Sequence, residues 1–343
     1  MHYRSITDMN AAIVNNMYRL PRDLDLVVGV PRSGLLAANL FALIANLRMA
    51  DLDSYLEGRV YSAGTTKTHS LRTVGAGPRK VLILDDSIST GSAMQTVRQR
   101  VQAAALGDEV IFAAVYGTAR DHPQTDIVLE VVPQPRVFQW NFMHHVTLER
   151  ACLDIDGVLC HDPAEHENED AAAYLQFLTE ARPLYAPTRP VGALVTSRLE
   201  KYRAQTEAWL AAIGVKYNEL IMLDMTSTPA QAQPAACERF KAEHYRKRPF
   251  ELFIGSGHAQ ARMIAQLSGK PVLCLETHRL IEPSAAAVLA SLPSAFSLRQ
   301  GGGALKRLAR SVLGRGRYEA LKEWRSVRRS AAPNSGASLP QPV

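Results

Sequence analysis

The sequence has few cysteines and no apolar run long enough to cross a membrane. Its four cysteines are Cys152, Cys160, Cys237 and Cys274. Since none of them forms a C-x-x-C pair, they do not predict a zinc site, and we expect reduced, buried thiols in a cytoplasmic protein. The longest apolar run, residues 35–47, contains two asparagines and is shorter than the roughly 20 residues that a membrane-spanning helix needs. The polar first ten residues also predict no signal peptide.

A net positive charge is present only at the C-terminal end of the chain. Residues 296–343 contain ten Lys or Arg and two acidic residues, a net charge of +8. The other 29 basic and 31 acidic residues leave the rest of the chain at −2, which argues against nucleic-acid binding by the whole protein. In this tail, 304–313 and 318–327 place apolar side chains on one helical face. The pattern predicts a basic amphipathic helix on an anionic membrane, although a helix packed on the protein body or a nucleic-acid contact would share it.

Short apolar runs alternate with helical stretches along most of the chain. In the first part they lie at 24–30, 81–84 and 110–116. The alternation starts again at Ala151, with runs at 152–159, 192–197, 220–223, 252–255 and 271–275. Apolar strands separated by helices are typical of parallel α/β sheets, so the sequence predicts two such sheets in succession.

The length of the chain fits the same organisation. At about 150 residues per domain, 343 residues suggest two domains, which can bury sizeable cores without disulfides or metals. We expect them at 1–148 and 149–290. Residues 291–343 should form a basic helical tail that ends in disorder, because their composition shifts to Gly, Arg, Ser and Pro.

The segment VLILDDSISTGSA, residues 81–93, joins an apolar strand, two acids and a hydroxyl-rich loop that enters a helix. Free backbone amides at the start of a helix bind anions, and a glycine lets the anion approach the backbone closely. Asp85 and Asp86 repel a phosphate, but they can accept hydrogen bonds from sugar hydroxyls or bind a cation. The segment therefore predicts a site for a sugar phosphate.

This segment closely resembles the phosphoribosyl pyrophosphate (PRPP) signature of type I phosphoribosyltransferases. The resemblance implies a Rossmann-like fold in which Asp85 and Asp86 hold the ribose hydroxyls and Mg²⁺ accompanies the pyrophosphate. It also implies that the 5-phosphate is held by Ser87, Ile88, Ser89, Thr90, Gly91 and Ser92. The segment VVGVPRSG, 27–34, resembles the family's pyrophosphate loop, with ligands from Arg32, Ser33 and Gly34.

Two further segments stand where the family has a mobile loop and an acceptor side. Residues 59–79 correspond to the loop and carry the basic residues Lys67, His69, Arg72 and Arg79, for which solvated loop charges are the simpler interpretation. On the acceptor side, Trp140 could stack on an acceptor ring, with His144 and His145 beside it. A packing cluster at the domain junction explains these three residues equally well.

The segment LDIDGVL, residues 153–159, resembles motif I of the haloacid dehalogenase (HAD) phosphatases. The resemblance implies that Asp154 attacks phosphorus and that Asp156 protonates the leaving alcohol and later activates water. Thr196, in VTS, matches the residue that donates to the phosphate, and Lys241 matches the lysine of the next motif. The short intervals between these motifs leave no room for a large cap domain.

The fourth HAD motif departs from the family pattern. In the family an acid after the strand completes the Mg²⁺ site formed with Asp154 and Asp156, but here the sequence continues as GSGHAQA from Gly255. Ser256 would bind Mg²⁺ through water, or the phosphatase would be slow or inactive. The activity of this half therefore depends on how the site is built.

Both motifs together resemble the transferase–phosphatase proteins of ribofuranose-containing bacterial polysaccharides. The resemblance implies transfer of 5-phosphoribosyl from PRPP to a hydroxyl of a lipid-linked glycan, and then removal of the 5-phosphate to leave β-ribofuranose. We expect a cytoplasmic protein, peripheral at the inner face of the cytoplasmic membrane through its tail, with no nucleic-acid partner. The alternatives are nucleobase salvage and a PRPP-sensing regulator without turnover.

Overall fold

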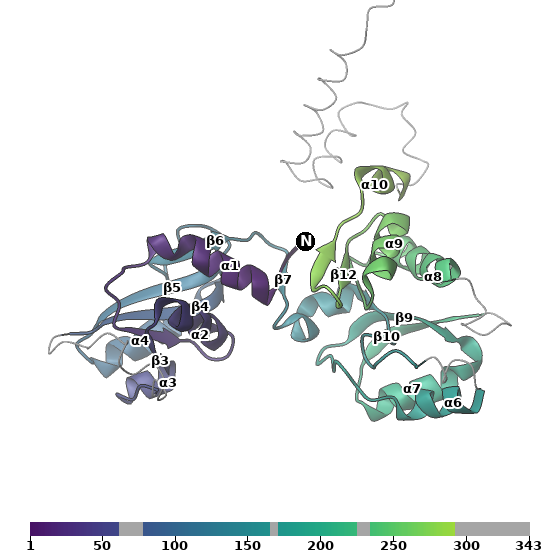
Figure 1. The fold of residues 1–343 in the computed structure, drawn as a ribbon, viewed down its shortest axis with the longest axis horizontal. Coiled ribbons are helices and arrows are strands. Elements are labelled where there is room, and N and C mark those ends of the chain that lie inside the picture. The colour runs from purple at the N-terminus through teal and green to yellow at the C-terminus, as the bar shows by residue number, and fades with distance from the viewer. Residues whose placement is uncertain (62–77, 165–170, 225–233, 292–343) are drawn as a thin grey trace, which may run out of the picture. The chain divides into compact units, whose positions relative to one another are not determined.

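The computed structural model describes residues 1–61, 78–164, 171–224 and 234–291 (Figure 1). The chain divides into one compact unit, Met1–Ser291, and a second, Leu292–Val343. The second unit, which holds the predicted basic tail, lies outside the described residues, as do Lys67, His69 and Arg72. Within the described part, no helix is long and apolar enough to cross a membrane.

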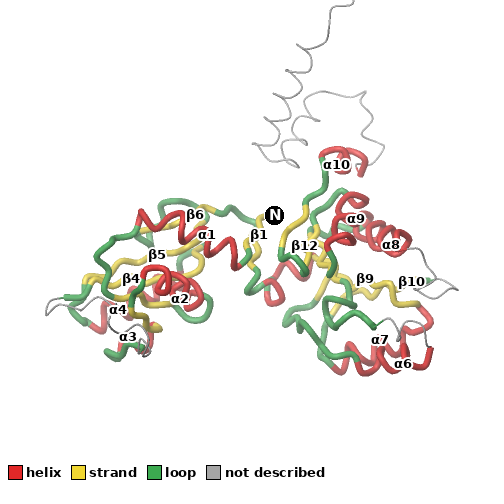
Figure 2. The backbone as a smooth tube through the Cα atoms, in the orientation of Figure 1, coloured by secondary structure: helices red, strands yellow, loops and turns green. Residues whose placement is uncertain are grey.

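The first sheet has five parallel strands in the order β3-β2-β4-β5-β6 (Figure 2). The strands are β2 (Leu26–Gly29), β3 (Arg48–Asp51), β4 (Lys80–Ile88), β5 (Glu109–Gly117) and β6 (Ile127–Val131). Its helices are α1 (Ile6–Asn16), α2 (Gly34–Ala45), α3 (Leu52–Leu56) and α4 (Ser92–Ala104). The parallel α/β class that the sequence predicts is confirmed.

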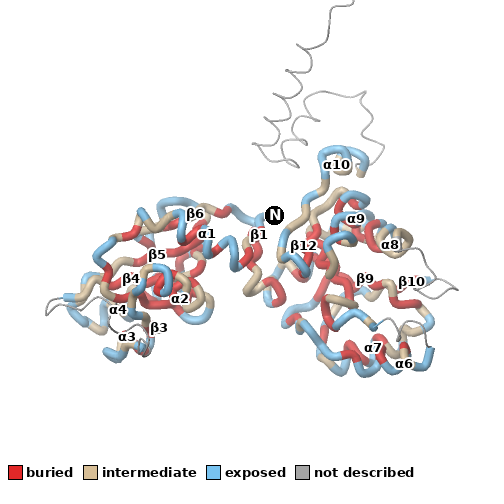
Figure 3. The backbone as a smooth tube through the Cα atoms, in the orientation of Figure 1, coloured by how far each residue is buried: buried red, intermediate tan, exposed pale blue. Residues whose placement is uncertain are grey.

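Helices cover both faces of this sheet, which explains why its strands are apolar throughout rather than alternating. Residues of α1 and α2 pack on one face, where Ile13 and Phe41 join Leu82 and Leu84 of β4. On the other face, residues of α3 and α4 pack around Ile83, which belongs to the same strand. The strands are accordingly buried, whereas the helices expose their outer faces (Figure 3).

Strand β4 is longer than its apolar run indicates. The predicted strand ended at Leu84, but the ladder with β5 continues, with Asp85 opposite Ala114 and Ser87 opposite Tyr116. The loop before α4 is therefore only 89–91. The prediction was wrong here because polar side chains at a strand end resemble a loop, although the backbone still pairs with its neighbour.

The second sheet has six strands in the order β10-β9-β8-β11-β12-β13, and all except β13 are parallel to their neighbours. They are β8 (Ala151–Leu153), β9 (Val191–Leu199), β10 (Tyr217–Leu223), β11 (Leu252–Gly255), β12 (Val272–Cys274) and β13 (Arg279–Ile281). The predicted second α/β sheet thus forms around β8.

Helices also cover both faces of the second sheet. They are α6 (Ala171–Glu180), α7 (Arg203–Ala212), α8 (Pro234–Lys247), α9 (His258–Ser268) and the short α10 (Ala285–Ser291). Phe177 of α6 and Trp209 of α7 belong to one buried cluster, and Tyr245 of α8 and Ile264 of α9 belong to another. In the described residues between β8 and β10 there are only α6, α7, strand β9 and the one-turn η5 (Glu200–Tyr202), so this part contains no cap domain.

Short elements connect the two sheets along the chain. Strand β1 (His2–Arg4) pairs in parallel with β7 (Arg136–Phe138), and the 3-10 helices η3 (Phe142–His144) and η4 (Val146–Arg150) follow, the second leading directly into β8. One further 3-10 turn, η1 (Met17–Arg19), follows α1. The cysteines are all free thiols; three are buried as expected, and Cys237 is only half-buried.

We expect Gly91→Ala to destabilise the start of α4. Gly91 has φ of 85°, and a Cβ there would lie 2.4 Å from Cε1 of His122. The left-handed backbone costs an alanine about 1–2 kcal/mol, and His122 must also move, so the free energy of unfolding should fall by more than that. Urea denaturation measures the change.

Gly107→Ala is the matched control. Gly107 has a similar φ of 76°, but a Cβ there meets nothing within 4 Å. This substitution should therefore cost only the backbone term. If both variants lose the same free energy of unfolding, His122 moves aside at no energetic cost, which would contradict the prediction.

Candidate functional site

Three segments meet at the carboxyl end of β4. This end lies where the strand order reverses, between β2 and β4, which is where open α/β sheets bind ligands. Ser33, from the loop after β2, donates its hydroxyl to Oδ1 of Asp86 at 2.6 Å. Trp140, which follows β7, donates its indole N–H to Oδ2 of the same carboxylate at 2.8 Å. The structure thus brings the predicted PRPP and acceptor residues to one carboxylate.

The start of α4 leaves a place for an anion. Gly91 precedes its first turn, and no side chain caps the helix there, so its first amides have no partner within the helix. The exposed Thr90 and Ser92 hydroxyls lie 3.2 Å apart at the same end. Uncapped amides and exposed hydroxyls can together surround a phosphate.

The pyrophosphate-like loop lies against the acidic strand end. A Cβ on Gly34 would come within 2.8 Å of Asp85 Oδ1 and 2.9 Å of the Leu84 carbonyl, so only glycine allows α2 to begin this close to β4. The Arg32 side chain is exposed and free to reach a ligand, and the Pro31–Arg32 peptide bond is cis. Ser33 and Gly34 therefore lie against the acidic strand end and Arg32 is exposed in the same loop, while pyrophosphate binding by these residues stays a prediction.

The two aspartates differ in their electrostatics. Burial, and next the charge of Asp86, raises the pKa of Asp85 to about 8. Asp85 is therefore largely a neutral acid at pH 7, and its Oδ1 accepts the backbone N–H of Asp86 at 2.8 Å. Asp86 is only 5% exposed, yet both its oxygens accept hydrogen bonds.

Arg136, to which the sequence analysis assigned no role, supplies positive charge to this end of the sheet. It is 5% exposed and donates to the carbonyl of Ile88 at 2.7 Å, at the end of β4. Burial lowers its pKa, and the nearby Asp86 charge opposes that effect. Nothing in the sequence singles it out, since an arginine after Pro135 is an ordinary feature.

Trp140 is held in a stack of aromatic rings. Its ring is parallel to that of Phe138, with centroids 4.8 Å apart, and Tyr116 lies beyond at 6.3 Å. The two histidines expected beside it are hydrogen-bonded elsewhere, His144 to Thr188 and His145 to Thr147. The Trp140 ring is therefore packed and its N–H reaches the site, while stacking on an acceptor ring stays a prediction.

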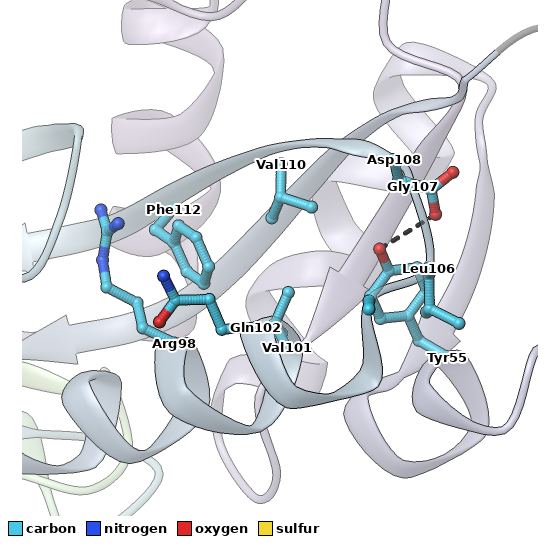
Figure 4. Close-up of a pocket in the computed structure, with 10 residues that line it drawn as sticks. Tyr55, Arg98, Val101, Gln102, Leu106, Gly107, Asp108, Val110 and Phe112 are labelled. Atoms are coloured by element: carbon cyan, nitrogen blue, oxygen red, sulfur yellow. Dashed lines mark hydrogen bonds between the residues drawn. The ribbon is translucent and has the colours of Figure 1, made fainter.

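Arg79 does not lie over the site. It precedes β4 and forms a 2.6 Å ion pair with Asp108 at the amino end of the sheet. A pocket of about 410 Å³ opens at the same end, where the Tyr55 hydroxyl donates to Asp108 (Figure 4). Since Asp85 and Asp86 lie at the carboxyl end, this pocket is separate from the phosphate loop.

The predicted phosphatase residues come from two neighbouring strands and one helix. Asp154 follows β8, Thr196 lies on β9, and Lys241 of α8 donates to Asp154 Oδ2 at 2.5 Å. All three are at most 3% exposed. Burial raises the pKa of Asp154 to about 6, while the Lys241 charge opposes the shift, so the carboxylate is mostly ionised at pH 7.

Asp156 is engaged in an ion pair that the sequence does not predict. Arg198, whose side chain is fully buried, donates to Asp156 Oδ1 from Nη2 at 2.7 Å and from Nε at 3.0 Å. Cys160 lies 3.4 Å from the same oxygen. The predicted proton donor is therefore engaged by a guanidinium, and this pair must open before Asp156 can act on a leaving group.

Ser256 lies beside a carboxyl group from another loop. A Cβ on Gly157 would meet the Ser256 Oγ at 2.6 Å and Asp162 Oδ2 at 2.8 Å. Burial, and next the charge of Asp156, raises the pKa of Asp162. Asp162 belongs to no recognisable motif, so the sequence alone does not indicate a role for it.

The two sites differ in how well they fit Mg²⁺. Among the described residues, no three His, Cys, Asp or Glu side chains are grouped to hold a metal ion. In the second site, Asp154 and Asp156 already pair with Lys241 and Arg198, so this donor set does not fit Mg²⁺. The first site fits an ion bound through one or two carboxylates and the phosphates of a substrate, as Mg²⁺ usually is.

The comparisons with known proteins concern a part of the chain. No protein-family model and no curated protein matches it. A purine phosphoribosyltransferase from Pyrococcus horikoshii aligns at 23% identity with a TM-score of 0.28, over 40% of this chain and 92% of the other. A xanthine-guanine-hypoxanthine phosphoribosyltransferase from Helicobacter pylori aligns at 18% identity with the same TM-score and coverage. Evidence for a function therefore comes from the geometry of the two sites described above.

Asp85→Asn should change how stability depends on pH. A folded-state pKa of about 8, above the usual 3.8, means that only the unfolded chain releases this proton between these values. Stability of the wild type should therefore fall as pH rises from about 4 to about 8. The variant lacks this loss, so its gain in Tm over the wild type should be larger at pH 8 than at pH 5. A gain independent of pH would contradict the buried acid.

Proposed function

We propose that the first site binds PRPP and transfers its 5-phosphoribosyl group to an acceptor. The observation that carries the proposal is the acidic pair at the end of β4, beside the uncapped start of α4 and in contact with the loop after β2. The Ser33 hydroxyl donates to Asp86 Oδ1 at 2.6 Å. The acids therefore lie between the two loops that would hold the substrate's phosphates. A ribose carrying phosphates at both ends fits that order of groups.

Each part of the site has a role in this reaction. The amides and hydroxyls of residues 87–92 would hold the 5-phosphate, Asp85 and Asp86 the ribose hydroxyls, and Arg32 with the amides after it the pyrophosphate. An acceptor hydroxyl attacks C1 as the C1–O bond breaks, and its proton passes to solvent or to the departing pyrophosphate. Bound Mg²⁺ would offset the charge of the pyrophosphate. The buried Asp86 carboxylate would stabilise the positive charge that develops on the ribose.

For the acceptor we propose a hydroxyl of a lipid-linked glycan. Two features support this. The same chain carries a second site that resembles a phosphatase site, and residues 296–343 have a net charge of +8. A basic tail with apolar faces would bring the protein to an anionic membrane where such acceptors lie. The alternatives are a nucleobase that stacks on Trp140, and a PRPP sensor without turnover.

For the second site we propose removal of the 5-phosphate from the product. Asp154, ionised beside Lys241, would attack phosphorus while the P–O bond to the ribose breaks, and water would then release the phosphate from the aspartyl group. Thr196 would donate to a phosphate oxygen. Asp156 would protonate the leaving ribose oxygen with a proton taken up from solvent, which requires its ion pair with Arg198 to open first.

Asp85→Asn combined with Asp86→Asn should abolish PRPP-dependent transfer and weaken PRPP binding at least roughly a hundredfold, because two hydrogen-bonding acids are lost. Calorimetry with PRPP and Mg²⁺ measures the affinity. The control is Asp23→Asn with Glu109→Gln, which changes charge at exposed residues around Lys80 at the amino end of the same sheet. Wild-type affinity in the first variant would refute the PRPP site.

The acceptor can be identified by measuring pyrophosphate release from PRPP in the presence of different candidate acceptors. Pyrophosphate release should require a glycan acceptor, with a product heavier by one ribose unit in mass spectra. Release with a nucleobase instead would identify a salvage enzyme. Tight PRPP binding with no release in either case would identify a sensor.

Asp154→Asn should separate the two reactions. The variant should transfer normally and accumulate a product that keeps its 5-phosphate, whereas the wild-type product should be lighter by one phosphate group. Mass spectra of the two products measure the difference. If the wild-type product also keeps its phosphate, the second half is not a phosphatase for this substrate, and the transfer assignment stands unaffected.

A further inference from the structure

Asp86 receives one donor on each oxygen, and the donors come from opposite sides of the site. Ser33 donates to Oδ1 at 2.6 Å, and the Trp140 indole donates to Oδ2 at 2.8 Å. The neutral Asp85 side chain also hydrogen-bonds to Asp86, so of the roughly four acceptor positions of the Asp86 carboxylate one remains open. A vicinal diol has two hydroxyl donors, and it matches this open position together with the acceptor oxygens of Asp85.

The indole donor has little freedom to turn. Its ring is parallel to that of Phe138 within 4°, and Phe138 in turn stacks on Tyr116, which is fully buried. The buried Arg136 guanidinium lies 5.4 Å from the Phe138 centroid and also holds the end of β4 through Ile88. The orientation of the Asp86 carboxylate is therefore set by a packed framework that includes Trp140.

We propose that Trp140 is a positioning residue for the ribose diol, acting through Asp86. Its N–H fixes the plane of the carboxylate, so that the open acceptor position of Asp86 and the Asp85 carboxyl beside it can receive a pair of adjacent hydroxyls. The ligand class it selects is a ribose phosphate, against 2-deoxyribose phosphates that offer one hydroxyl fewer. This inference rests on the proposed function, since it assumes that the ribose of PRPP binds at Asp86.

The test compares the affinities of ribose 5-phosphate and 2-deoxyribose 5-phosphate in Trp140→Phe, which keeps an aromatic ring and loses the N–H. The wild type should prefer ribose 5-phosphate. The variant should lose roughly tenfold in affinity for ribose 5-phosphate, as for a hydrogen bond to a charged group, and little for the deoxy sugar. The affinity ratio, measured by calorimetry, should therefore fall towards one.

Trp209→Phe is the matched control. Its indole N–H donates to the Ala181 carbonyl at 2.8 Å in the second sheet's core, so the same chemical change there should leave both affinities as in the wild type. An unchanged ratio in Trp140→Phe, or equal losses for both sugars, would overturn the inference, because a merely structural role weakens both alike.

Two further results complete the test. If the wild type binds PRPP but Trp140→Phe keeps the ratio, the inference fails and the proposed function stands; if the wild type binds neither PRPP nor ribose 5-phosphate, the proposed function fails and the inference with it. If Trp140→Phe does not fold, the indole N–H resonance of Trp140 in the wild type replaces it. That resonance should shift with ribose 5-phosphate more than with the deoxy sugar, and equal shifts would overturn the inference.

Discussion

The buried carboxylate of Asp86 is the group around which the first site is organised. A charge removed from water is costly unless it is hydrogen-bonded or paired. Here Ser33 and Trp140 donate to it, while Arg136 lies nearby. The neighbouring Asp85 follows the other course, since burial beside a negative charge leaves it protonated to about pH 8. The loop after β2, the end of β4 and the segment after β7 are therefore tied together by one charge.

The second site meets the same constraint with ion pairs. Asp154 is matched by Lys241 and Asp156 by Arg198, and both cations are almost completely buried. Removing one member of such a pair leaves an unpaired buried charge, which is strongly destabilising. The pairs explain how these buried acids can be a stable part of the fold.

Local sequence predicted what depends on neighbouring residues. The apolar runs gave the strands, and the segment from Asp85 to Ser92 was placed correctly before α4, because strand, loop and helix start follow one another in the chain. The far end of β4 was misjudged, since its polar residues pair with β5. Arg136, Asp162 and the Trp140–Asp86 and Arg198–Asp156 contacts were not foreseen. These contacts join residues more than 40 positions apart and arise only from packing.

The two sites differ in how readily a substrate can use their acids. Asp86 is held by neutral donors that leave one acceptor position open, so a sugar hydroxyl can bind without breaking a contact. Asp156 is held by a guanidinium through charge-assisted bonds, which are about twice as strong as neutral ones. Proton transfer from it must first open that pair. A ligand that uses Asp156 would therefore have to break charge-assisted bonds, whereas a sugar hydroxyl at Asp86 would not.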